Sequence, residues 1–250
     1  MGGAVSRFET GTKVAMSTAD EQKKAAGEAA AALVQDGMIV GLGTGSTAAH
    51  FVRAVGRRAS AEKLTLRCVP TSVATDTLAR ALGLPIISLD EAGEIDLTVD
   101  GADEIGPDLT LIKGGGAALL REKLVWEASR YCVTIADAAK VVPVLGAFAL
   151  PVEVIAFGHS TSARRLAAAV AAAGVVAEPL LRLKGGQPVQ TDSGQYIYDL
   201  ACGAIPDPAR LANAIKRVTG VVDHGLFLGL ADEALVGGDS GVARLVRSSI

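Results

Sequence analysis

The chain has 250 residues and a nearly balanced charge, with 24 Lys and Arg against 27 Asp and Glu and a net charge of −3. A general nucleic-acid-binding protein needs clustered excess Lys and Arg, so this balance argues against that class. Half of the residues are hydrophobic but only 4% are aromatic. This composition favours a large aliphatic core over global disorder and argues against a base-stacking surface.

The cysteines and the apolar segments bear on the location of the protein. The chain has three cysteines, Cys68, Cys132 and Cys202, which is an odd number, and they form no CxxC motif. We therefore expect free thiols and a reducing, cytoplasmic compartment. Cys132 and Cys202 lie in apolar, strand-like segments and are expected to be buried. The longest charge-free apolar stretches, 141–152 and 166–177, are shorter than the ~18–20 residues of a membrane-spanning helix.

The first 16 residues have no apolar core and contain charged side chains, so we expect a loose extension and no signal peptide. We consider Met16 as an alternative start of the chain. From there to about residue 136 the predicted helices alternate with short apolar strands. In chain order they are a helix at 18–36 (capped by Ser17 or Thr18 and ended by Gly37), a strand at 38–42, a helix at 47–59, a strand at 64–69, a helix at 73–82, strands at 86–89, 95–99 and 109–112, a helix at 117–130 and a strand at 131–136.

Strands that are short and apolar throughout suit a parallel sheet covered on both faces. Their alternation with helices predicts an α/β fold with a doubly wound, mostly parallel, Rossmann-like sheet. In such sheets ligands bind beyond the carboxyl ends of the strands.

The order of elements changes after Pro143. Strands are predicted at 151–157, 177–183, 195–200 and 221–228, and helices at 161–173 and 207–217. This β-α-β-β-α-β order is typical of a ferredoxin-like α+β arrangement, and the polar run 184–194 is predicted to be a hairpin loop. We therefore expect a small α+β domain over 148–220, and an α/β catalytic domain of residues 1–147 plus 221–250.

The first unusual loop is GLGTGST, at 41–47, between a predicted strand and a predicted helix. Glycines allow close approach to a ligand, and a helix N-terminus offers free N–H groups to an anion. The hydroxyls of Thr44, Ser46 and Thr47 add donors, so the loop suits a phosphate. The dinucleotide motif GxGxxG needs glycine where Ser46 stands, and the lysine of a P-loop is absent. The alternative is a tight strand–helix turn without a ligand.

The second loop is DGADE, at 100–104, directly after an apolar strand. Gly101 permits a sharp bend that can aim Asp100 and Asp103 into one crevice. Such carboxylates can orient sugar hydroxyls, act as acid or base, or hold Mg²⁺. The alternative is a solvated acidic turn.

The third loop is KGGGAALLREK, at 113–123. Lys113 ends a predicted strand, and three successive glycines suit close backbone approach to a ligand. Glu122 lies in the first two turns of the helix that follows. The alternative for Glu122 is an exposed carboxylate paired with a neighbouring base such as Lys123.

We expect all three loops to follow strands of one parallel sheet and so to bring together hydroxyls and helix N–H groups, carboxylates, a lysine and a glutamate. We find no metal-ligand set and no nucleotide motif, so this inventory suits cofactor-free proton chemistry on a small phosphorylated polyol. A carboxylate out of water can remove a proton next to a carbonyl, and positive charge beside the enediolate stabilises it. We expect Asp103, Lys113 and Glu122 to line one crevice.

With these three loops the sequence resembles the ribose-5-phosphate isomerase type A family. The motifs that carry the resemblance occur in the family's order over about residues 18–240. They are GTGSTA (43–48), DGADE (100–104), KGGGAALLREK (113–123), IADAAK (135–140), PVEV (151–154) and GLF (225–227). The resemblance implies interconversion of D-ribose 5-phosphate and D-ribulose 5-phosphate in the non-oxidative pentose phosphate pathway, without a cofactor or a metal.

The resemblance also places the family's functional residues on this sequence. It puts the catalytic base on Glu122 and the other catalytic groups on Asp100, Asp103 and Lys113. The substrate-binding positions that it implies are Thr44, Gly45, Ser46, Thr47, Asp100, Gly101, Ala102, Asp103, Lys113, Gly114, Gly115, Gly116 and Lys140. The extension 1–16 and the segment 156–200 depart from the family's pattern.

From both lines of argument we expect Glu122 to move a proton from C2 to C1 through a cis-enediolate. Lys113 offsets the charge that develops on the substrate oxygens. Asp100 and Asp103 orient hydroxyls, and one of them shuttles a proton between O1 and O2. The residues 44–47 and Lys140 hold phosphate or distal hydroxyls.

Three other functions compete with an isomerase. A sugar-phosphate sensor would usually carry a DNA-binding module, for which residues 1–16 are too short. A sugar-phosphate hydrolase or deaminase would place a catalytic histidine in the site, whereas His50, His159 and His224 suit helix or core positions. A nicotinamide dehydrogenase lacks its motif. We expect a small-molecule sugar phosphate as the partner, no nucleic acid or membrane, and a homodimer or tetramer.

Overall fold

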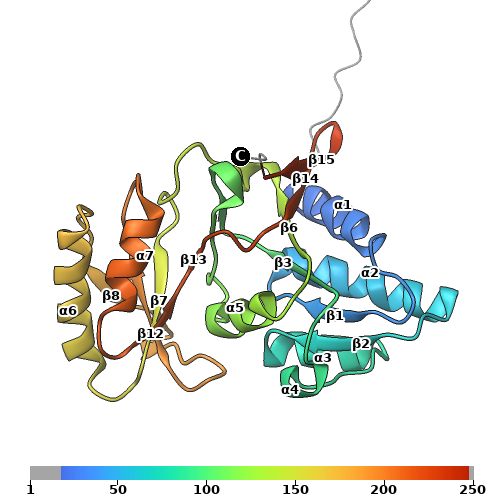
Figure 1. Ribbon diagram of the computed structural model, residues 1–250, viewed down its shortest axis with the longest axis horizontal. Coiled ribbons are helices and arrows are strands. Elements are labelled where there is room, and N and C mark those ends of the chain that lie inside the picture. The colour runs from blue at the N-terminus through green and yellow to red at the C-terminus, as the bar shows by residue number, and fades with distance from the viewer. Residues whose placement is uncertain (1–17, 248–250) are drawn as a thin grey trace, which may run out of the picture.

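The computed structural model describes residues 18–247, which form a large lobe and a small lobe joined by a narrow third sheet (Figure 1). The large lobe holds a six-stranded sheet of order β15-β14-β6-β3-β1-β2, in which all neighbours are parallel except β15. Its strands are β1 Ile39–Leu42, β2 Arg67–Pro70, β3 Leu97–Gly101, β6 Cys132–Asp137, β14 Glu233–Gly238 and β15 Gly241–Val246. The predicted mostly parallel α/β sheet is confirmed, with one antiparallel edge strand.

Helices cover this sheet on both faces. They are α1 Ala19–Ala31, α2 Ser46–Glu62, α3 Val73–Ala81, α4 Leu89–Ala92 and α5 Leu119–Glu127. Thr18 caps α1 in a reciprocal capping box with Glu21, as predicted. The helix ends at Ala31, earlier than its predicted limit of 36. Near this end the guanidinium of Arg58 donates hydrogen bonds to the carbonyl oxygens of Ala31 and Val34.

Two further elements of the large lobe differ from the prediction. The predicted strand at 86–89 is wrong, because only Ile86 pairs, in a single bridge to Cys68, and Leu89 already begins α4. Ser88 caps this helix in a capping box, and the local signal of the cap outweighs the apolar run before it. Strand β3 begins at Leu97 and extends through Gly101, so Asp100 lies inside the strand.

The small lobe has a four-stranded antiparallel sheet of order β12-β7-β11-β8 (β7 Leu150–Val154, β8 Pro179–Leu181, β11 Tyr196–Leu200, β12 Val221–His224). Helices α6 His159–Ala172 and α7 Pro208–Lys216 complete the predicted β-α-β-β-α-β order. The run 184–194 holds part of a hairpin, β9 Leu183–Lys184 with β10 Gln187–Pro188. Because β12 pairs with β7, a boundary after residue 220 would separate β12 from its own sheet; the domain division stays a prediction.

A three-stranded antiparallel sheet of order β13-β5-β4 lies between the lobes (β4 Glu104–Ile105, β5 Leu111–Ile112, β13 Leu226–Phe227). The chain leaves β3, forms β4, turns through the 3₁₀ helix η1 Pro107–Leu109 and returns as β5. The expectation that all three loops follow strands of one parallel sheet is therefore wrong. Only the first two do, and the third follows β5.

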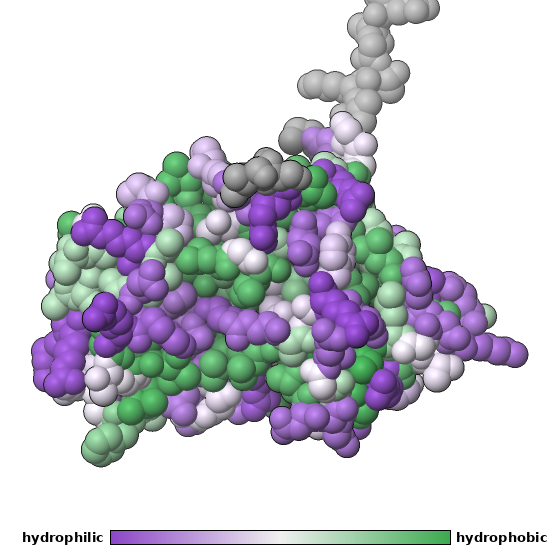
Figure 2. All heavy atoms as spheres, viewed as in Figure 1, coloured by the Kyte–Doolittle hydropathy of each residue, from purple (hydrophilic) through white to green (hydrophobic). Residues whose placement is uncertain are grey.

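The aliphatic residues gather in the interior, whereas the face in Figure 2 mixes polar residues with apolar ones. Cys68 and Cys132 are buried as strand residues, but Cys202 is only partly buried and lies in no strand, contrary to the prediction. Within residues 18–247, no helix is long and apolar enough to cross a membrane. The predicted extension 1–16 and Met16 lie outside the described residues.

Candidate active site

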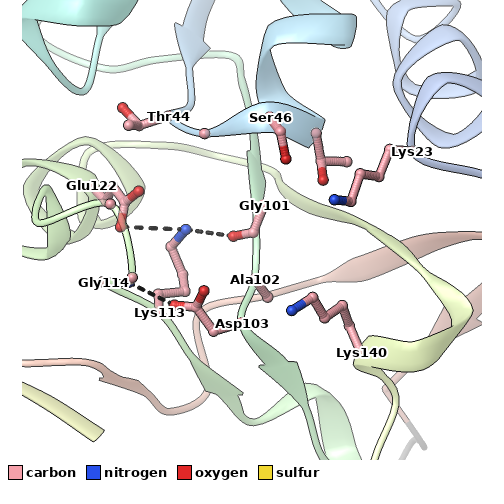
Figure 3. Close-up of a pocket in the computed structure, with 14 residues that line it drawn as sticks. Lys23, Thr44, Ser46, Gly101, Ala102, Asp103, Lys113, Gly114, Glu122 and Lys140 are labelled. Atoms are coloured by element: carbon pink, nitrogen blue, oxygen red, sulfur yellow. Dashed lines mark hydrogen bonds and ion pairs between the residues drawn. The ribbon is translucent and has the colours of Figure 1, made fainter. Parts of the chain in front are cut away.

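A pocket of about 140 Å³ lies beyond the carboxyl ends of β1 and β3, between the large-lobe sheet and the loop after β5 (Figure 3). This is the edge at which open α/β sheets bind ligands. The residues that line the pocket are Lys23, Thr44, Gly45, Ser46, Thr47, Gly101, Ala102, Asp103, Lys113, Gly114, Gly115, Gly116, Glu122 and Lys140. Every predicted site residue except Asp100 is among them, and Asp103, Lys113 and Glu122 share one crevice.

A buried ammonium between two carboxylates forms the floor of the pocket. Nζ of Lys113 lies 3.1 Å from Oδ2 of Asp100 and 3.4 Å from Oε2 of Glu122, and it donates a hydrogen bond to the carbonyl of Gly101. Exposure is 2% for Lys113, 0% for Asp100 and 4% for Glu122. The alternative of an exposed Glu122 paired with Lys123 is wrong, because Lys123 binds Asp223.

The charges of this cluster do not balance, since one ammonium faces two carboxylates. Burial raises the pKa of Glu122 to about 8; the negative charge of Asp100 adds to this shift, and Lys113 opposes it. Burial alone would lower the pKa of Lys113, but the charges of Asp100 and Glu122 outweigh it, and the pKa lies above its usual value. Burial raises the pKa of Asp100 as well, although Lys113 opposes that shift. Of the two carboxyl groups only Glu122 lines the pocket, so it is the one that can exchange a proton with a ligand near neutral pH.

Asp100 is buried beneath the pocket and does not line it. Its Oδ1 accepts hydrogen bonds from the backbone N–H groups of Thr44 and Gly101, and its Oδ2 faces Lys113. A Cβ on Gly43 would lie 2.2 Å from Oδ1 of Asp100, so glycine at this position lets the first loop approach the carboxylate. This position favours a role in holding Lys113 and the first loop over the expected role of orienting substrate hydroxyls.

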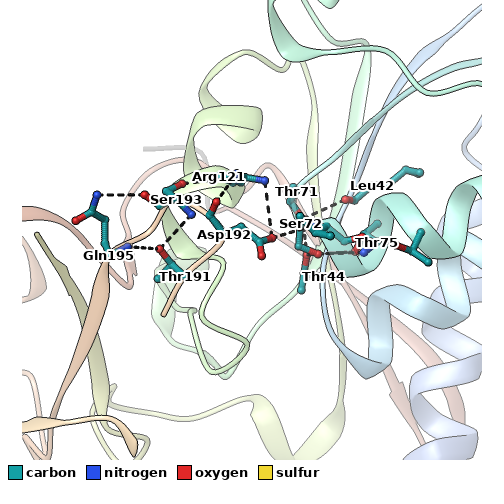
Figure 4. Close-up of polar contacts among 12 residues, drawn as sticks. Leu42, Thr44, Thr71, Ser72, Thr75, Arg121, Thr191, Asp192, Ser193 and Gln195 are labelled. Carbon is teal, nitrogen blue, oxygen red and sulfur yellow. Dashed lines mark hydrogen bonds and ion pairs between the residues drawn. The ribbon is translucent and has the colours of Figure 1, made fainter. Parts of the chain in front are cut away.

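The hydroxyl of Thr44 is turned away from the pocket, contrary to the expectation that it contacts a ligand. Its Oγ1 lies 2.7 Å from Oγ1 of Thr71 and 2.8 Å from Oγ of Ser72, the residue that caps α3 (Figure 4). Thr75, on the first turn of α3, donates to the carbonyl of Gly43. The hydroxyl cluster therefore fixes the shape of the loop, which leaves Ser46 and Thr47 as the hydroxyl donors of the pocket.

Two lysines stand at the end of the pocket opposite Glu122. Figure 3 shows the amines of Lys23, on α1, and Lys140, in the 3₁₀ helix η2 Ala138–Lys140 after β6, on the side of Ser46. Together with the N-terminus of α2, which begins at Ser46, they place positive charge where an anion can bind. Lys23 was missed by the sequence analysis because a single lysine on an alanine-rich helix carries no local motif.

We expect Lys23→Ala to raise the KM for a phosphorylated substrate about tenfold and to change kcat less than threefold, because a charge-assisted contact to phosphate, remote from the reacting carbons, acts in both ground state and transition state. Lys24→Ala is the matched control, since Lys24 is exposed on the same helix and does not line the pocket. Steady-state kinetics of the two variants measure the difference. A KM for Lys23→Ala within twofold of wild type would remove Lys23 from the anion site.

The histidines and cysteines lie outside this pocket. His50 bonds Asp20 through Nε2, His159 bonds the hydroxyl of Tyr198, and His224 is buried in β12. Burial raises the pKa of the thiols of Cys68 and Cys132 to about 12, which makes them poor nucleophiles. The residues that line the pocket thus include neither a histidine for hydrolysis nor a cysteine for thiol chemistry.

The comparisons with known proteins agree with this geometry. A family model described as ribose 5-phosphate isomerase A (phosphoriboisomerase A) matches residues 67–241. The ribose-5-phosphate isomerase A of Caulobacter vibrioides (strain NA1000 / CB15N) is 62% identical over 228 residues, which cover 91% of this chain and 99% of that protein. The solved ribose 5-phosphate isomerase from Plasmodium falciparum is 36% identical with a TM-score of 0.87, over 92% of this chain and 100% of that one.

A solved D-ribose-5-phosphate isomerase in complex with phospho-erythronic acid is 34% identical to this chain, with a TM-score of 0.85. The match covers 92% of this chain and 100% of that one. The family model covers the second and third loops of the pocket, at 100–104 and 113–123, and the relatives cover more than nine-tenths of the chain. The chain belongs to the ribose 5-phosphate isomerase A family.

Proposed function

We propose that this protein is an aldose–ketose isomerase that interconverts D-ribose 5-phosphate and D-ribulose 5-phosphate through a cis-enediolate, in the non-oxidative pentose phosphate pathway. The observation that carries the proposal is the pair of Glu122 and Lys113, buried 3.4 Å apart at one end of a pocket whose other end holds Lys23 and Lys140. A proton-transfer group and a phosphate site are thereby separated along one pocket, as an open-chain sugar phosphate requires.

In this mechanism the phosphate lies against Lys23, Lys140 and the N-terminus of α2, and the carbonyl end of the sugar lies against Lys113. Carboxylate Glu122 takes the proton from C2, and electrons move toward O1, so that an enediolate forms. The ammonium of Lys113 offsets the charge on O1 and O2 without reorganisation, because it is already fixed by Asp100. Glu122 then returns the proton to C1.

Asp103 is the carboxylate of the second loop that faces the pocket, so we assign the orientation of substrate hydroxyls and the proton shuttle between O1 and O2 to it. The same groups open the sugar ring. The relative in complex with phospho-erythronic acid supports this arrangement, because that compound combines a phosphate with a carboxylate, which carries negative charge on two oxygens as an enediolate does.

The raised pKa of Glu122 predicts the pH dependence of the reaction. Only the ionised carboxylate acts as the base, so kcat/KM should rise with pH and level off above about 8. Initial rates between pH 6.5 and 9.5 measure this, above the second ionisation of the substrate phosphate near 6. A profile that is flat over this range would contradict a base with a raised pKa.

We also propose that the reaction needs no cofactor, since Lys113 supplies the positive charge beside the reacting oxygens. The direct test adds ribose 5-phosphate and follows formation of ribulose 5-phosphate with EDTA present. Turnover at the same rate with and without EDTA is the expected result. Binding without product would favour a sensor, and activity that is lost with EDTA and restored by Mg²⁺ would contradict the metal-free mechanism.

A cytoplasmic location and a homo-oligomer, either dimer or tetramer, complete the proposal. The location follows from a metabolic function on a phosphorylated sugar and from three free thiols, of which Cys202 is partly buried. Light scattering of the purified protein measures the oligomeric state, and a mass of 25.4 kDa in solution would contradict an oligomer.

A further inference from the structure

Arg182 extends from the small lobe to the glycine loop next to Lys113. It lies between β8 and β9, and its Nη1 donates hydrogen bonds to the carbonyl oxygens of Gly114 at 2.9 Å and Gly115 at 3.2 Å. Asp199, on β11, binds the same guanidinium through Nε and Nη2. Because this two-point pair fixes the plane of the guanidinium, Arg182 is oriented toward the loop without help from a ligand.

The peptide unit between Gly114 and Gly115 is held at both ends by charged side chains. Its carbonyl accepts from Arg182, and its N–H donates to Oδ2 of Asp103 at 2.8 Å. A positive charge beside the oxygen and a negative charge beside the N–H polarise the peptide in the same direction, so each hydrogen bond strengthens the other. A Cβ on Gly115 would lie 2.6 Å from Oδ1 of Asp103, so glycine permits this approach.

We propose that Arg182 is a positioning residue for the isomerase reaction, which acts through the Gly114–Gly115 peptide on the orientation of Asp103. The proposal rests on the proposed function, in which Asp103 orients substrate hydroxyls. It gives the small lobe a part in the reaction, although none of its described residues lines the pocket. The pair of Arg182 with Asp199 transmits the rigidity of that sheet to the loop that carries Lys113.

The test compares Arg182→Met with Arg58→Met. Arg58 on α2 is a close match, since its guanidinium binds Glu62 through Nε and Nη2 and donates from Nη1 to two backbone carbonyls, but it lines no part of the pocket. We expect Arg182→Met to lower kcat about tenfold, because small losses of alignment are costly, and Arg58→Met to stay within twofold of wild type. Equal kcat values for the two variants would overturn the proposal.

A double-mutant cycle separates positioning from general structural damage. If Arg182 acts through Asp103, then Arg182→Met should cost less than twofold in kcat when Asp103→Asn is already present. The same tenfold loss in both backgrounds would overturn the proposal. If Arg182→Met fails to fold, Arg182→Lys replaces it, because lysine keeps one charge but cannot bind Asp199 at two points and a carbonyl together; its expected loss is about threefold.

Amide hydrogen exchange of Gly115 tests the same contact without turnover. Loss of Arg182 should speed exchange at the Gly115 N–H at least tenfold and leave the amides of α1 and α2 unchanged. Unchanged exchange at Gly115 would overturn the proposal even in an active enzyme. A wild-type protein that does not convert ribose 5-phosphate would instead contradict the proposed function, and the two failures are therefore distinguishable.

Discussion

Glu122→Gln lowers kcat for ribose 5-phosphate by about 10³- to 10⁴-fold and leaves ligand affinity within about threefold of wild type. The amide has nearly the size of the carboxyl group but cannot take up the proton from C2, so the contribution of general base catalysis is lost. Steady-state kinetics give kcat, and calorimetric titration with a non-reacting sugar-acid phosphate gives the affinity. Turnover near the wild-type rate would remove Glu122 from the role of base.

The same variant, although nearly inactive, should be more stable than the wild-type protein at high pH. The pKa of Glu122 is about 8 in the folded protein and near the usual 4.5 of a glutamate in the unfolded chain, so the folded state binds one more proton than the unfolded chain between these pH values. The free energy of unfolding therefore falls as pH rises from about 4.5 to 8. Glutamine lacks this titration, and Glu122→Gln should be more stable than wild type at pH 9 by on the order of a few kcal/mol. Denaturant unfolding at pH 4.5 and pH 9 measures the difference, which should vanish at the lower pH.

Lys113→Met removes the cation from a buried site that keeps both carboxylates. Breaking a buried ion pair at one partner costs about 3–5 kcal/mol of stability, and loss of the charge beside the enediolate lowers kcat by about 10²- to 10³-fold. The loss of stability should shrink below neutral pH, where Asp100 and Glu122 can take up protons. Thermal unfolding at pH 6 and pH 9, together with kcat per folded molecule, measures both effects.

Lys123→Met is the matched control for this variant. Lys123 is also buried, lies 2.6 Å from Oδ1 of Asp223 and, like Lys113, stands over the ring of Phe227. It does not line the pocket, so its loss should lower the free energy of unfolding and leave kcat within threefold. An equal loss of kcat per folded molecule in both variants would contradict a role specific to Lys113 in the reaction.

The loops of the site could be predicted because their signals are local in sequence. Clustered glycines beside Thr44 and Lys113 are poor for packed elements, and the carboxylates at 100–104 are clustered directly after an apolar strand. Both signals indicate a ligand wherever the loops lie in the fold. The sheet that carries Lys113 could not be predicted. The strands β4 and β5 have two residues each, which is too short for any periodicity to separate a parallel strand from an antiparallel one.

Single residues contributed by distant elements escaped the sequence analysis for a related reason. Lys23 reaches the pocket only because α1 packs beside the sheet, and Arg182 reaches the glycine loop only because the small lobe folds back on the large one. The direction of the hydroxyl of Thr44 depends on Ser72 and Thr75, which come from the next helix. Such contacts arise from tertiary packing, which a local sequence pattern does not predict.

The central claim, proton transfer by Glu122 through an enediolate, is tested most directly by isomerisation in D₂O followed by NMR. After many turnovers the wild-type protein should place solvent deuterium at C1 of ribulose 5-phosphate and at C2 of ribose 5-phosphate, and Glu122→Gln should place none over the same time. Conversion of the sugar with full retention of protium at both carbons would contradict the account, because it would indicate a hydride shift between the carbons.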